Sequence, residues 1–147
     1  MNDAKLTNIG LLALRISVGL VMVLFGAQKL LGAFGGAGFN GTIKWMGSQG
    51  IPSWLAALAI FAEFFGGLGL IFGVFTRFAA FGVACTMGGA LITKFKEVGW
   101  QVDTQANAMQ TFSGLGFPLV IMGASLALML IGGGQLSLEN KFLKRKR

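Results

Sequence analysis

Four long apolar stretches decide what this chain can fold into. A helix that crosses a bilayer needs roughly 20 mostly apolar residues, and the stretches cover residues 9–31, 54–75, 78–93 and 114–134. The third is short, and its flanks complete it to 77–95. Only 12% of the residues are charged, about half the share of a soluble domain. A soluble bundle of core helices would also keep a polar face, which these stretches lack. The sequence therefore predicts an all-α fold, a four-helix transmembrane bundle in a single membrane domain, 1–147.

The distribution of basic residues predicts the orientation of this bundle. Four spans put both termini on one side of the membrane, together with the tight turn after the second span. That side carries seven cations, Lys5, Arg77, Lys141, Lys144, Arg145, Lys146 and Arg147. The opposite side carries four, Lys29, Lys44, Lys94 and Lys96. The positive-inside rule places both termini and the basic tail, 139–147, in the cytoplasm. Because such a tail faces anionic lipid, the net charge of +7 requires no nucleic-acid partner.

The connections on the outer side are expected to contribute structure of their own. Within the first one, 41–49 predicts a short interfacial helix, and Trp45 and Trp54 suit an outer aromatic belt. The connection between the third and fourth spans, 94–113, is polar and long for a plain loop. It is expected to form a lid over the outer face or to be mobile.

The composition excludes most resident cofactors. The chain has no His and no Tyr, and Cys85 is its one cysteine. Haem needs an axial His, Met, Cys or Tyr, and iron–sulfur clusters need several thiolates. Structural zinc also draws on Cys and His. We expect no haem, iron–sulfur, zinc or other metal site in this chain.

Two helical stripes carry the charges of the spans. In the first span the stripe consists of Arg15, Gly19, Met22, Gly26 and Lys29, at spacings of 4, 3, 4 and 3. Such spacing places all five on one side of a helix. Glu63 lies on a similar stripe of the second span, formed with Ala56, Ala59, Gly66, Leu70 and Gly73. Small residues on such a stripe let another helix backbone approach closely.

A charge left in lipid at mid-membrane costs about 2.5–3.5 kcal/mol on insertion scales. Counted from the ends of their spans, Glu63 lies about 13 Å and Arg15 about 9 Å deep, from opposite sides. An arginine side chain can bridge the remaining difference in level if the helices are adjacent. We therefore predict an Arg15–Glu63 ion pair, with a protonated Glu63 as the alternative. Lys29 lies near the outer end, where it can extend to the headgroups.

Several short motifs, in this order and spacing, resemble the DoxX-like family of small integral membrane proteins. The resemblance covers nearly the whole chain and rests on Arg15 with Gly19, Gly26-Ala27-Gln28-Lys29-Leu30, Gly50-Ile51-Pro52, Ala62-Glu63 with Gly66-Gly67, Gly73-Val74-Phe75-Thr76-Arg77, Pro118, and Gly134-Gln135-Leu136-Ser137-Leu138-Glu139.

The resemblance implies a four-helix bundle in the bacterial inner membrane. It also implies, for some members, a quinone-reducing thiosulfate dehydrogenase subunit, and for others an association with thiol or redox partners. This chain departs from the family pattern because it lacks a His near the end of the third span. It also has Gly116-Phe117 in place of an acidic residue before Pro118.

Three functions remain open. In the first, the protein is a subunit of a membrane redox complex that interacts with quinone. Glu63 then accepts protons, Arg15 stabilises anionic species, Lys29 or Gln28 lies near a ring carbonyl, and Met22 lines the slot. In the second, it is a non-catalytic structural or assembly subunit whose charges fix the helix register. The third is a small transporter with Glu63 as proton relay. Partner subunits and self-association are both compatible with the sequence.

Overall fold

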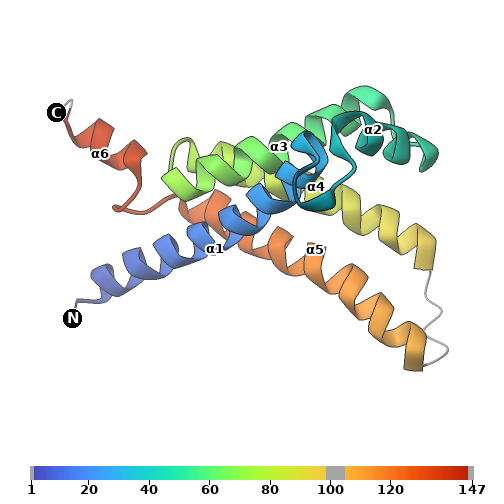
Figure 1. Ribbon diagram of the computed structural model, residues 1–147. Coiled ribbons are helices and arrows are strands. Elements are labelled where there is room, and N and C mark those ends of the chain that lie inside the picture. The colour runs from blue at the N-terminus through green and yellow to red at the C-terminus, as the bar shows by residue number, and fades with distance from the viewer. Residues whose placement is uncertain (1, 99–104, 146–147) are drawn as a thin grey trace.

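Six α-helices make up the described part of the computed structural model (Figure 1). It describes residues 2–98 and 105–145, and the side chains of 2–96 and 114–142. The helices are α1 (Asp3–Leu31), α2 (Gly38–Ser48), α3 (Ser53–Phe72), α4 (Thr76–Val98), α5 (Gln105–Ile131) and α6 (Leu138–Arg145), with a short 3-10 turn, η1 (Ala33–Gly35). Within these ranges there is no strand, and α1, α3, α4 and α5 are long and apolar enough to cross a membrane. The predicted all-α, four-helix membrane fold is confirmed, and α2 is the expected helix of the first connection.

The ends of the helices differ from those of the predicted spans. α1 begins at Asp3 rather than at residue 9, because polar residues continue a formed helix readily and an acidic first turn suits its N-terminus. α3 ends earlier than predicted, since Gly73 takes the left-handed conformation (φ 68°) that closes a helix. Much of 94–113, expected to be a lid or mobile, is helical, and 99–104 lie outside the described residues. The basic tail contains α6.

The helices pack mainly as two pairs, α1 on α3 and α4 on α5, and the contact between α3 and α4 joins the pairs. Both chain termini lie at one end of the bundle, which we call the terminal end, and α2 lies at the opposite end, the α2 end (Figure 1). α6 is also at the terminal end. The two ends of the α1–α3 pair hold the charged residues that the sequence singles out.

Glycines bring α1 and α3 together. A Cβ on Gly19 would lie 2.7 Å from the carbonyl oxygen of Gly67, and one on Gly26 would lie 2.6 Å from the Cα of Phe64. Real side chains do not tolerate such distances, so the two backbones touch at these points. The stripe of α1 therefore faces α3, as its spacing predicts, whereas α3 makes this contact with Phe64 and Gly67, and Gly66 of its predicted stripe faces α4.

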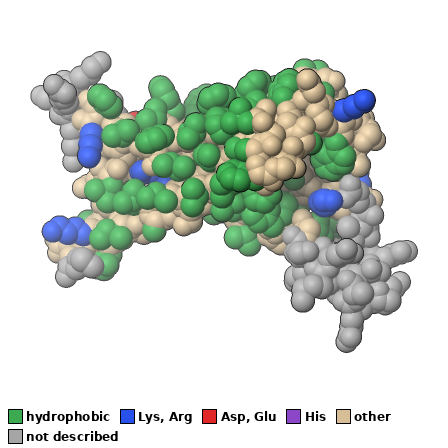
Figure 2. Space-filling model, viewed as in Figure 1, with side chains coloured by type: hydrophobic (Ala, Val, Ile, Leu, Met, Phe, Trp, Pro, Cys, Tyr) green, Lys and Arg blue, Asp and Glu red, His purple; other side chains and the backbone are tan. Residues whose placement is uncertain are grey.

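The core is apolar, and so is the exterior. The buried core cluster comprises Leu11, Val18, Met22, Leu70, Ala80, Val83, Met87, Ile121 and Leu128. Large apolar side chains are also exposed on every long helix, among them Leu20 (52%), Leu58 (57%), Phe81 (54%) and Val120 (68%). Figure 2 shows hydrophobic side chains over the middle of the molecule and Lys and Arg side chains towards its two ends. An exterior of this kind is unfavourable in water and suits lipid.

Candidate functional site

A buried ion pair joins α1 to α3 towards the α2 end. The ammonium of Lys29 lies 2.6 Å from both carboxylate oxygens of Glu63 and donates a hydrogen bond to each. The Glu63 side chain is 4% exposed, whereas that of Lys29 is 33% exposed. The carboxylate is thus enclosed by protein, and the surroundings of the molecule reach the pair only from the side of the lysine.

Local packing explains why these two groups meet. Gly26 lies against the backbone of Phe64, so α1 touches α3 one residue beyond Glu63. Lys29 follows Gly26 by almost one helical turn and therefore projects from the same side of α1. The backbone carbonyl of Lys29 also accepts a hydrogen bond from the hydroxyl of buried Thr42 on α2, at 3.4 Å. Three helices thus fix the position of the lysine.

Aromatic side chains surround this part of α3. The ring of Phe61 lies 5.9 Å from that of Phe39 and 6.0 Å from that of Phe65, and the rings of Phe64 and Phe65 are 5.3 Å apart. Phe61 and Phe65 are 41% and 56% exposed. An apolar, lipid-facing surface therefore flanks the segment that carries Glu63.

Arg15 occupies a separate site, at the terminal end of the same helix pair. Its side chain is 1% exposed, and Nε donates to the carbonyl of Leu70 at 3.0 Å and Nη2 to that of Ile71 at 3.4 Å. These are two of the last four carbonyls of α3, which have no partner within the helix. Nη1 donates to the carbonyl of Gly133, after α5, at 2.5 Å. Arg15 thus caps α3 and fastens the segment that follows α5 to it.

The predicted Arg15–Glu63 ion pair is wrong. Arg15 lies level with Leu70, seven residues and about 10 Å along α3 from Glu63. The guanidinium finds unpaired carbonyls at its own level, while Lys29 reaches the carboxylate directly. Lys29 accordingly does not simply extend to the headgroups. No carboxylate within the described residues forms an ion pair with Arg15.

The structure separates the other residues predicted for a quinone slot. Met22 is fully buried in the core cluster, and its place in a quinone slot stays a prediction. Gln28 is half-buried beside Lys29, and its backbone lies directly beneath Gly36, where no side chain would fit. Of the predicted group, the structure brings together Glu63 and Lys29. Among the described side chains, no three His, Cys, Asp or Glu residues gather in a way that could hold a metal ion.

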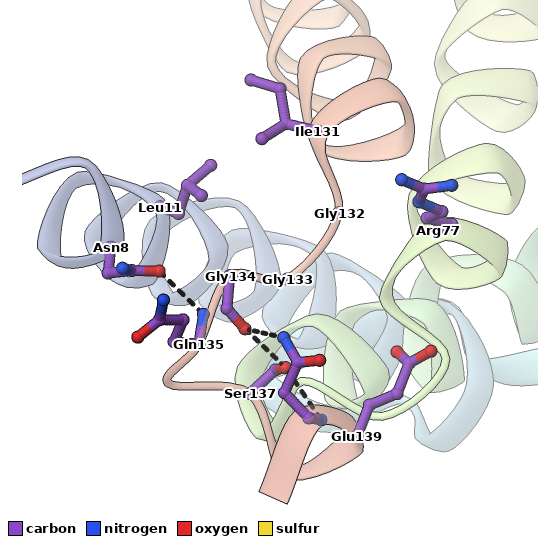
Figure 3. A pocket seen from close by; sticks show the side chains of 11 residues that line it. Asn8, Leu11, Arg77, Ile131, Gly132, Gly133, Gly134, Gln135, Ser137 and Glu139 are labelled. Carbon is purple, nitrogen blue, oxygen red and sulfur yellow. Dashed lines mark hydrogen bonds between the residues drawn. The ribbon is translucent and has the colours of Figure 1, made fainter. Parts of the chain in front are cut away.

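A pocket of about 410 Å³ lies at the terminal end (Figure 3). Its wall comes from the first turns of α1 and α4, the end of α5, the glycines 132–134 and the start of α6. Two charged side chains, Arg77 and Glu139, line it. The backbone N–H of Thr76 donates to Glu139 Oε2 at 3.3 Å, so the acid also caps α4. The sequence did not predict this pocket, although Arg77 and Glu139 are the last residues of two of the motifs that resemble the DoxX-like family.

The chain was compared with known proteins. Residues 10–96 match the DoxX family. A Bacillus subtilis (strain 168) protein named "Putative oxidoreductase CatD" is 31% identical over 143 residues, which cover 97% of this chain and 94% of the relative. "Inner membrane protein YqjF" of Escherichia coli (strain K12) is 30% identical over 143 residues, with 96% and 98% covered. "Inner membrane protein YphA" of the same organism is 30% identical over 137 residues, with 89% of each chain covered. No solved structure matches the chain.

The fold and its exterior define a small integral membrane protein with four helices long enough to span a bilayer. Two basic side chains, the one-third exposed Lys29 and the buried Arg15, connect its first two spans, Lys29 through a carboxylate and Arg15 through carbonyl groups. The chain belongs to the DoxX family.

Proposed function

We propose that the protein is an inner-membrane subunit of a redox complex and that it interacts with quinone at Lys29 and Glu63, with both termini in the cytoplasm. One observation carries the proposal: a carboxylate enclosed by protein is paired with a lysine that is one-third exposed, beside an aromatic, lipid-facing surface. The name of the Bacillus subtilis relative supports redox function, and the names of the Escherichia coli relatives support the inner membrane.

The residues present fit a quinone by their chemistry. A quinone needs an apolar surface for its ring and hydrogen-bond donors for its carbonyls. The ammonium of Lys29 has three donor hydrogens, and Phe61 and Phe65 provide apolar surface on the neighbouring helix. A molecule dissolved in the bilayer would reach Lys29 first, because Glu63 lies behind it.

In this proposal the chain transfers protons to the quinone, and a partner subunit supplies the electrons. Quinone takes up two electrons and two protons to become quinol. The predicted absence of haem, iron–sulfur and zinc sites leaves the electrons to a partner subunit with a haem, flavin or thiolate centre. The Lys29 ammonium orients the ring carbonyl and donates a proton to the reduced ring oxygen. Water on the exposed side of the lysine reprotonates it and supplies the second proton, while the Glu63 carboxylate holds the ammonium in place. We assign Arg15 to holding the helices together, since its donors are directed at backbone carbonyls.

A non-catalytic role is the second candidate, and the geometry of the pair favours it. Lys29 binds both oxygens of Glu63, and Arg15 locks the other end of the same two helices. Two such contacts fix the register of α1 on α3, and this role requires no proton transfer. In that case the protein would be a structural or assembly subunit of a membrane complex.

A charge exchange separates the two candidates. The double variant Lys29→Glu/Glu63→Lys restores an ion pair but places the carboxylate on the exposed side. If the pair handles protons, the exchanged complex will assemble normally and will lose at least about tenfold in quinone reduction. If the pair is structural, assembly and turnover will both recover relative to each single variant. The complex must be purified from native membranes, and its partner subunits identified, for this assay.

Quinone binding is tested directly by photolabelling. A short-chain azidoquinone is irradiated with the purified complex, and labelled peptides are mapped by mass spectrometry. We expect labelling in 25–39 and 58–68, suppressed by excess unlabelled quinone. Labelling that excess quinone does not suppress, or that lies wholly outside these segments, would contradict a quinone site at this pair.

A further inference from the structure

The pocket at the terminal end lies at the level of lipid headgroups. Arg77 is the second residue of α4, and Ile131 is the last of α5, so both membrane-spanning helices end at the pocket. The headgroup region of a bilayer begins where the roughly 30 Å hydrocarbon core ends. Beside the pocket, the apolar side chains of Phe78, Leu130 and Ile131 are 80%, 72% and 59% exposed. A molecule in the pocket with acyl chains would lay them over this surface.

Three of the four neutral polar side chains of the pocket already form hydrogen bonds with the wall. Asn8 Oδ1 accepts from the backbone N–H of Gln135 at 2.7 Å, and Asn140 Nδ2 donates to the carbonyl of Gly134 at 2.6 Å. The hydroxyl of Ser137 donates to the same carbonyl at 2.8 Å. These bonds shape the wall, as Figure 3 shows. They leave the recognition of charged groups to Arg77 and Glu139, and the amide of Gln135 also lines the pocket.

Among the described residues, Arg77 and Glu139 use only a small part of their hydrogen-bonding capacity. A guanidinium has five N–H donors, and Arg77 uses one on the carbonyl of Leu130, at 3.4 Å. A carboxylate has about four acceptor positions, and Glu139 uses one on the backbone N–H of Thr76. The two side chains line the same pocket, yet they form no ion pair with each other in the described structure. The pocket thus offers one cation and one anion, held apart.

We propose that this pocket binds the headgroup of a zwitterionic phospholipid with a primary ammonium group. Arg77 binds the phosphate, for which a guanidinium fork is well suited, and Glu139 accepts hydrogen bonds from the ammonium. A volume of about 410 Å³ is within the usual range for small-ligand sites. The site lies at the opposite end of the α1–α3 pair from Lys29 and Glu63, so it is independent of the proposed quinone function.

Lipid competition on the unaltered chain gives the first test. The full-length protein, purified in mild detergent, is titrated with phosphatidylethanolamine, phosphatidylcholine or phosphatidylglycerol, and bound lipid is measured by native mass spectrometry. We expect phosphatidylethanolamine to bind about tenfold more tightly than the other two. A quaternary ammonium cannot donate hydrogen bonds to Glu139, and a glycerol headgroup carries no cation. Equal retention of the three lipids would overturn the proposal.

Variants assign the two ends of the headgroup. Glu139→Gln keeps a carbonyl oxygen for the cap of α4, and it should weaken phosphatidylethanolamine about tenfold while leaving phosphatidylglycerol unchanged. Arg77→Gln should weaken both lipids. Lys141→Gln is the control, because this exposed cation of α6 does not line the pocket. A loss with Lys141→Gln as large as that with Arg77→Gln would show general attraction by charge and would overturn the site.

The source of the headgroup is tested with a soluble compound. O-phosphoethanolamine carries the same two charged groups without acyl chains. If a lipid is the ligand, an equal concentration of this compound will leave the bound phosphatidylethanolamine in place, because the exposed apolar side chains hold only the lipid. Displacement at equal concentration would overturn the assignment to a lipid.

Discussion

Replacing Lys29 and replacing Glu63 should lower the free energy of unfolding by unequal amounts. Lys29→Met leaves the Glu63 carboxylate, 4% exposed, without its partner. Removing one partner of a buried pair typically costs about 3–5 kcal/mol, and we expect about 3 kcal/mol here. Glu63→Gln should cost only about 1 kcal/mol, because Lys29 is one-third exposed and can turn towards the headgroups. The asymmetry follows from the difference in exposure.

The assay is equilibrium unfolding in bicelles by steric trapping. The double variant Lys29→Met/Glu63→Gln should lose about 2 kcal/mol, which corresponds to a coupling of about 2 kcal/mol between the two side chains. Lys44→Met, at an exposed lysine of α2, is the control and should change stability by less than about 0.5 kcal/mol. Equal losses in the two single variants, or losses that simply add in the double variant, would refute the reasoning from burial.

Three further predictions concern the packing of α1 and the end of α3. Gly26→Ala should destabilise by about 1–3 kcal/mol, since its Cβ would lie 2.6 Å from the backbone of α3, whereas Gly10→Ala meets no atom within 4 Å and should not. Gly73→Ala should lose more stability than Gly50→Ala: both positions have a positive φ, 68° and 80°, but only a Cβ at Gly73 would clash, 2.8 Å from the guanidinium of Arg15. Equal losses in thermal unfolding would contradict this clash. Arg15→Lys should unfold earlier and raise hydrogen exchange in the segment after α5, because one ammonium cannot span the carbonyls of two segments; unchanged exchange would argue against the clamp.

The sequence predicted the helices and the side of α1 that touches α3 well, because both follow from local periodicity. Apolar length located the four spans, and the spacing of Gly19 and Gly26 identified the side of α1 that touches α3. Which charges pair depends on where two helices cross and on which acceptors lie nearest. The carbonyls of α3 that bind Arg15 have no partner within the helix because α3 ends at Phe72. The apolar run continues to residue 75 and does not mark this boundary. Backbone acceptors of this kind leave no pattern in a sequence.

Arg15 and Lys29, the two basic side chains of α1 that contact α3, differ in what they can do. They are 14 residues apart, about 21 Å along the helix, so they lie towards opposite boundaries of a roughly 30 Å core. Arg15 is 1% exposed, and its three hydrogen bonds to described residues go to backbone carbonyls that cannot take up or release a proton. The Lys29 side chain is 33% exposed, and its partner is a carboxylate, which can. We therefore place the proposed exchange of protons at Lys29 and Glu63, and we assign Arg15 to keeping the register of the helices that carry them.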